Sequence, residues 1–275
     1  MSAVTMRAPT VFSRLRWILA GGRSGATTAR YCRTVAVLVA CVSVVLLNAY
    51  AGVLILLRSS VYGVRLYRPM LLNIALSFVP VLGAIVAVAG LFGLPALLSL
   101  TSVRPGIAFT AIWVYLIAGT CVWVLFFPNA IYLITELNFS HRRDDDPVPL
   151  WYDIVQTLTL TLSGIANAVL SLAVVQTAFV LLLDPESADA VPASSWAFAG
   201  VIIVLGAIGV YLGRYLRFNS WDARHPASLL RKLGAHLRQR GKALEAGGFV
   251  LTHALLIALI YAPVYGLGYR ALVAG

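Results

Sequence analysis

The sequence has little charge for its length. Of its 275 residues, 11% are charged and 60% are hydrophobic, and the mean hydropathy is +0.89. A soluble domain carries about a quarter charged residues, and so few charges cannot cover a folded chain of this size without leaving large apolar patches exposed. The composition excludes a soluble enzyme and predicts an integral membrane protein.

Cysteine is also scarce, with three residues and no paired spacing. This spacing gives no disulfide framework, and Cys41 and Cys121 lie within apolar runs, as small buried hydrophobic residues do. The four histidines and the acidic run 144–146 form neither an HExxH motif nor a histidine pair, so we expect no metal site. The chain also lacks an ATP-binding loop, and we expect no cofactor.

Long apolar runs make up most of the chain. A helix needs about 20 apolar residues to cross about 30 Å of hydrocarbon, and six runs pass this test. We therefore expect an all-α fold, a polytopic transmembrane helical bundle in which a basic tail (1–33) precedes a transmembrane domain (34–273). The stretch 94–105 leaves a seventh span open, and Pro80 and Pro128 predict kinks or broken turns. The expected spans are approximately 34–57, 70–91, 107–127, 151–182, 195–213 and 247–269.

The net charge of +11 is spread between the apolar runs, which indicates membrane-surface charge and no nucleic-acid site. Six spans place the loops 58–69, 138–149 and 214–246 on one membrane face, here called face X, with thirteen of the 21 basic residues. The loop 184–194 on the other face holds three acids and no base. This favours a cytoplasmic face X, although the six arginines of the tail favour the opposite orientation.

Two predicted spans carry patterns of small or polar residues. Gly206, Gly209 and Gly213 follow a spacing that lets helices approach closely in lipid. A polar stripe in the fourth span cannot face lipid cheaply, so it either hydrogen-bonds other helices or lines a substrate pathway. The stripe consists of Asp153, Gln156, Ser163, Asn167 and Ser171.

The basic loop 223–246 has leucines at helical spacing. This pattern is typical of an amphipathic helix that lies on anionic lipid; a solvated basic loop is the alternative.

Three motifs stand out, and together they resemble a bacterial integral membrane family known as domain of unknown function 1361. They are FFPNAIYLITEL (126–137), PLWYD (149–153) and GVYLGRYLRFNSWD (209–222). The resemblance covers about residues 65–265 and implies a multi-pass protein of the bacterial plasma membrane whose activity is unassigned. The chain departs from the family pattern at Ile131, Glu136 and Phe218, where Pro, Asp and Trp are usual.

Costly polar residues collect where the predicted spans reach face X. Arg214 and Arg217 share one face of a helix end, where a guanidinium costs about 2.5 to 3.5 kcal/mol unless it is paired or reaches the interface. They either form ion pairs that fix helix register, with Glu136, Asp153 or Asp222 as partners, or hold a phosphate or carboxylate by bidentate hydrogen bonds. The candidate ligand-binding residues are Arg214, Arg217, Asn219, Asp222, Glu136, Asp153 and Asn129.

These residues favour a protein that binds or transports an anionic lipid or amphiphile. The alternatives are a membrane-embedded enzyme that acts on a lipid-linked substrate, with Glu136, Asp153 or His253 as acid or base, or a membrane assembly scaffold. We expect membrane lipids, mainly anionic ones, as partners. The sequence identifies neither a catalytic residue nor a protein partner.

Overall fold

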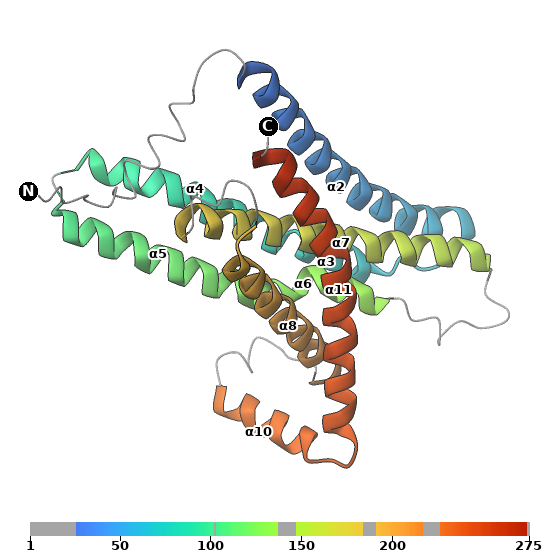
Figure 1. Cartoon of the computed structure of the whole chain (residues 1–275). Coiled ribbons are helices and arrows are strands. Elements are labelled where there is room, and N and C mark those ends of the chain that lie inside the picture. Colours follow the sequence, from blue (N-terminus) through green and yellow to red (C-terminus); the bar gives the residue numbers. More distant parts are fainter. Residues whose placement is uncertain (1–25, 102, 137–146, 184–190, 217–225, 274–275) are drawn as a thin grey trace, which may run out of the picture.

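The computed structural model shown in Figure 1 describes residues 26–101, 103–136, 147–183, 191–216 and 226–273. The described parts form helices and connecting turns and contain no strand, so the predicted all-α class is confirmed. The helices are α2 (Ala26–Tyr62), α3 (Arg68–Ser77), α4 (Val79–Ser99), α5 (Pro105–Phe126), α6 (Pro128–Ile131), the 3₁₀ helix η1 (Tyr132–Glu136), α7 (Leu150–Leu183), α8 (Ala193–Leu216), α10 (Pro226–Leu237) and α11 (Lys242–Val273).

Six stretches of the described chain are long and apolar enough to cross a membrane, and each expected span falls within one of them. The second stretch extends to Ser99, so part of the ambiguous segment 94–105 belongs to α4, and the described residues hold no seventh candidate. The stretches are Thr34–Tyr62, Arg68–Ser99, Pro105–Glu136, Leu150–Leu183, Ala193–Leu216 and Lys242–Ala271.

Two of these spans are broken at the predicted prolines. Phe78 separates α3 from α4, two residues before Pro80, and Phe127 separates α5 from α6, directly before Pro128. Proline supplies no backbone donor, so each proline leaves the carbonyl four residues earlier without its usual helical partner. Next to the first break, the Pro80 carbonyl accepts hydrogen bonds from Trp123 Nε1 (3.1 Å) and Ser171 Oγ (3.0 Å), which tie α4 to α5 and α7.

Helix α7 is the centre of the fold and packs against α2, α3, α4, α6, η1, α8 and α11. Its polar stripe is buried, and apart from Ser163, which bonds to the Leu160 carbonyl of α7 itself, its members bond to other helices. Asn167 donates to Ser77 Oγ (2.7 Å) and exchanges hydrogen bonds of 3.1 Å with Asn48 of α2. Further along, Gln176 donates to Ser195 Oγ of α8 and accepts from Tyr261 Oη of α11, both at 2.6 Å. The prediction of interhelical hydrogen bonding is confirmed.

Glycines let α7 and α8 approach the broken segment α6–η1 from two sides. A Cβ at Gly209 would overlap the Pro128 ring, and one at Gly206 would lie 2.7 Å from Ile131 Cδ1. On α7, a Cβ at Gly164 would lie 2.5 Å from the Ala130 carbonyl oxygen. The predicted close approach is confirmed, and its partner is the segment that follows Pro128.

This packing predicts that Gly209→Ala destabilises the protein. The added methyl overlaps the Pro128 ring, and overpacking of this kind costs about 1 to 3 kcal/mol. Gly200→Ala is the matched control, since the same helix has nothing within 4 Å of a Cβ there and alanine favours a helix. Thermal unfolding in detergent should separate the two, and equal stability of both variants would contradict the packing.

Candidate functional site

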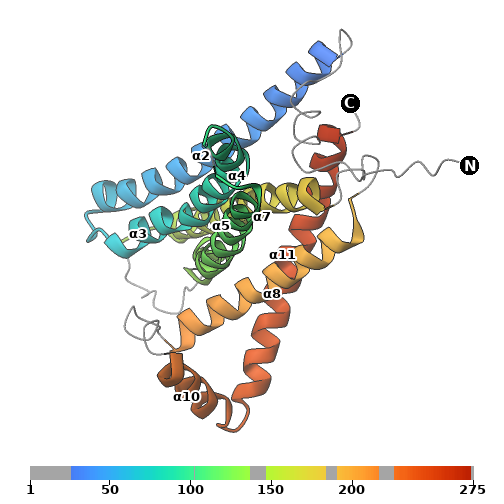
Figure 2. The ribbon, with the colours of Figure 1, turned by 90° about the vertical axis from the view of Figure 1, so that its left-hand side faces the viewer.

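Contacts bring together several of the helix ends that carry candidate residues: the end of α2 meets the start of α7, and η1 meets α3. Figure 2 shows the end of α2 and the start of α3 at the left, and α10 beyond the end of α8 at the lower left. Face X, the side to which alternate connections of six spans return, is the expected location of these helix ends.

Asp153 lies in the first turn of α7 and is 9% exposed. Arg58, near the end of α2, donates from Nε to Asp153 Oδ1 at 2.9 Å. This charge-assisted bond links the face-X ends of two helices that pack along each other. Sequence reasoning missed Arg58 as the partner, although Arg58 is the first base after the first span and the number of spans places it on face X.

Glu136 ends η1 and accepts a hydrogen bond on Oε1 from Asn73 Nδ2 of α3, at 2.9 Å. One turn earlier on α3, the Met70 thioether accepts from Gln156 Nε2 at 3.6 Å. Gln156 is 3% exposed, and its Oε1 has no hydrogen-bond partner. Asn73 and Met70 were not predicted, because an amide and a thioether inside an apolar run resemble ordinary packing residues.

Arg214 lies in the last turn of α8 and is half-buried. The preceding residue packs against η1, since a Cβ at Gly213 would lie 3.6 Å from Tyr132 Cε2. Within the described chain, Arg214 forms no ion pair with Glu136 or Asp153, which take partners from α3 and α2 instead.

The other candidate residues divide into two groups. Asn129 is half-buried in α6, seven residues before Glu136 and deeper in the same broken span. Arg217, Asn219 and Asp222 lie outside the described residues.

An aromatic cluster holds α10 against α8 and α11. Tyr211 Oη lies 2.8 Å from His236 Nε2 of α10, and the Tyr211 ring packs against Phe249 of α11. His253, considered above as an acid or base, stacks on Phe249 with ring centroids 3.8 Å apart, and its Nδ1 lies 2.9 Å from the Phe249 carbonyl oxygen. The basic segment predicted over 223–246 therefore contains a helix, Pro226–Leu237, that is anchored to α8 and α11.

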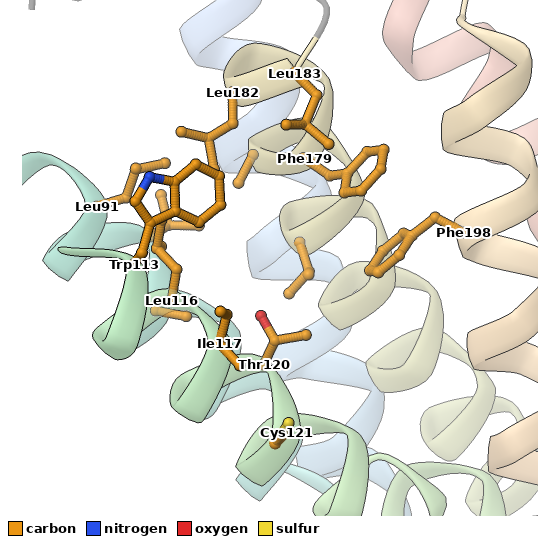
Figure 3. A pocket seen from close by; sticks show the side chains of 14 residues that line it. Leu91, Trp113, Leu116, Ile117, Thr120, Cys121, Phe179, Leu182, Leu183 and Phe198 are labelled. Atoms are coloured by element: carbon orange, nitrogen blue, oxygen red, sulfur yellow. The ribbon is translucent and has the colours of Figure 1, made fainter. Parts of the chain in front are cut away.

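A separate apolar groove of about 300 Å³ opens between α4, α5, α7 and α8 (Figure 3). Trp113, Phe179 and Phe198 border it, and Thr120 and Cys121 add one hydroxyl and one thiol. Phe179 lies near the end of α7, far from its face-X start. A hydrocarbon chain suits this lining, and the groove offers no charged group.

The fold and these contacts define a multi-pass helical membrane protein with polar and charged side chains gathered at one face. The chain belongs to the family described as "Protein of unknown function (DUF1361)", which it matches over residues 72–260. The match includes all three motifs that carry the resemblance. No curated protein and no solved structure matches the chain.

The link between Arg58 and Asp153 predicts a measurable coupling. Arg58→Met removes a charge-assisted hydrogen bond, which contributes about 1.5 to 3 kcal/mol, and the partly exposed pair is expected near the lower end of that range. A double-mutant cycle with Asp153→Asn, followed by thermal unfolding, isolates the pairwise energy. Strictly additive effects of the two substitutions would contradict a direct interaction.

Proposed function

We propose that the protein binds an anionic lipid or amphiphile at face X, either as a receptor or as the first step of transport, in a bacterial plasma membrane. The observation that carries this proposal is that the two candidate carboxylates already have other partners, so that neither pairs with Arg214. Asp153 is bonded to Arg58 and Glu136 to Asn73, which leaves the half-buried Arg214 guanidinium without a described counter-charge. A phosphate or carboxylate of a lipid headgroup supplies that charge with matching bidentate geometry.

The wider charge of face X supports the same ligand class. The described residues from its loops and helix ends include nine bases and three acids, and each base near a membrane surface contributes about 1 kcal/mol of attraction to anionic lipid. Helix α10 adds an amphipathic surface, with Leu230 66% exposed beside Arg231 and Lys232.

The contacts of α8 near Arg214 support a specific site over diffuse attraction. Tyr132 lies close to this end of α8, since a Cβ at Gly213 would be 3.6 Å from its ring, and Tyr211 bonds to His236 of α10. Arg217, Asn219 and Asp222 continue the same motif and remain candidate ligands of the headgroup, as does Asn129 at the break.

We expect Arg214→Gln to weaken retention of phosphatidylglycerol about tenfold, because a charge-assisted hydrogen bond contributes about 1.5 kcal/mol or more. Native mass spectrometry of the protein purified with this lipid measures the retained fraction. Arg104→Gln is the matched control, since Arg104 is an exposed arginine in the connection between the second and third spans, on the opposite face. Equal retention by the wild type and both variants would overturn the proposal.

A further inference from the structure

A group of hydrogen-bond acceptors lies at face X where α3, η1 and α7 meet. These three elements all pack against one another. Gln156 of α7 is 3% exposed, and its Oε1 has no partner, while its Nε2 is directed to the Met70 thioether. A buried amide oxygen without a donor loses free energy relative to water, and in the described chain Gln156 Oε1 is the only buried side-chain polar atom in this state.

The geometry places Glu136 at the same level of the membrane. Thr161 Oγ1 lies 3.5 Å from the Leu133 carbonyl oxygen, and Gly164 faces Ala130, so η1 runs antiparallel to α7. From that contact, η1 advances about 6 Å to Glu136, and α7 extends about 7.5 Å in the same direction to Gln156. Both residues contact the same face of α3, at positions one turn apart.

Within the described residues, the charge of this group is unbalanced. Glu136 receives a hydrogen bond from the neutral amide of Asn73, and no cation of the described chain pairs with it, whereas the neighbouring Asp153 has Arg58. The missing component is therefore both a hydrogen-bond donor and a positive charge. A primary ammonium group provides three donors and one charge, while a hydroxyl group supplies a donor alone.

We propose that Glu136 and Gln156 bind the primary ammonium group of a phospholipid headgroup, with Gln156 Oε1 as acceptor and Glu136 as counter-charge. This inference rests on the proposed function, in that the phosphate of the same headgroup lies at Arg214. Tyr132 connects the two positions, because its ring packs beside Gly213, next to Arg214, and Glu136 follows it four residues later in η1. The ligand class is then an amine-bearing phospholipid.

A competition between phosphatidylethanolamine and its N-acetyl derivative tests the ammonium site, since the two lipids share the phosphate and differ in the amine. In native mass spectrometry of the purified protein, the wild type is expected to retain the amine form about tenfold better. Gln156→Met and Glu136→Gln should bring this ratio close to one while retention of the N-acetyl form persists. Glu245→Gln is the matched control, because Glu245 is a face-X acid already paired with Lys242.

The outcomes separate this inference from the proposed function. Equal retention of the two lipids by the wild type, with retention still dependent on Arg214, would overturn the ammonium site alone. A tenfold preference for the amine that survives Arg214→Gln would support the ammonium site and count against the phosphate at Arg214. Displacement of the lipid by an equal concentration of soluble phosphoethanolamine would overturn a lipid source for the amine.

Stability of the Gln156 variant provides a second measurement. Gln156→Met replaces an unsatisfied acceptor with an apolar group of similar shape, so lipid-free protein in detergent should unfold at the same temperature or higher. Added phosphatidylethanolamine should then raise the unfolding temperature of the wild type more than that of the variant. A lower unfolding temperature of the lipid-free variant would indicate a structural partner for this oxygen and overturn the inference.

Discussion

The need to satisfy a broken backbone inside the membrane governs this structure. After Pro128 the third span continues as α6 and η1, where regular α-helical hydrogen bonding is interrupted, and irregular backbone at this depth is tolerated only when protein surrounds it. Glycines on α7 and α8 meet this requirement by bringing two helices against the segment, at Gly164 on one side and Gly209 on the other. The first family motif therefore lies in the core, packed between α7 and α8.

The same packing positions the charged ends of the spans. Because α6 and η1 are held between α7 and α8, Tyr132 lies against the end of α8 and Glu136 reaches α3. The start of α7 is fixed separately by the bond between Asp153 and Arg58. Residues far apart in the sequence are thus brought to one face by helix packing, and the ligand site proposed for that face depends on the break at Pro128.

Much of the fold was predictable because the bilayer imposes simple constraints. Six apolar runs of sufficient length, two prolines and one glycine stripe predicted the spans, the breaks and a close helix approach. The individual partners were not predictable, since a hydrogen bond between Asn73 and Glu136 depends on rotation and register that hydropathy does not encode. The number of spans placed Arg58 on face X together with Asp153, but this count could not distinguish Arg58 from Arg214 as the partner of the carboxylate.

The distribution of hydrogen-bonded and unpaired polar side chains supports the proposed headgroup site at one face of the membrane. In the membrane interior, polar side chains of α7 are hydrogen-bonded to other helices. Asn167 bonds to Asn48 and Ser77, and Gln176 bonds to Ser195 and Tyr261. A polar headgroup that crossed there would have to break these hydrogen bonds, and lipid tails offer no replacement partners to offset the lost free energy. The acceptor that lacks a donor is instead Gln156, near the face-X start of α7, while the apolar groove lies in the other half of the bundle. The proposed headgroup site therefore lies at face X, whereas the described groove in the other half is lined almost entirely by apolar side chains.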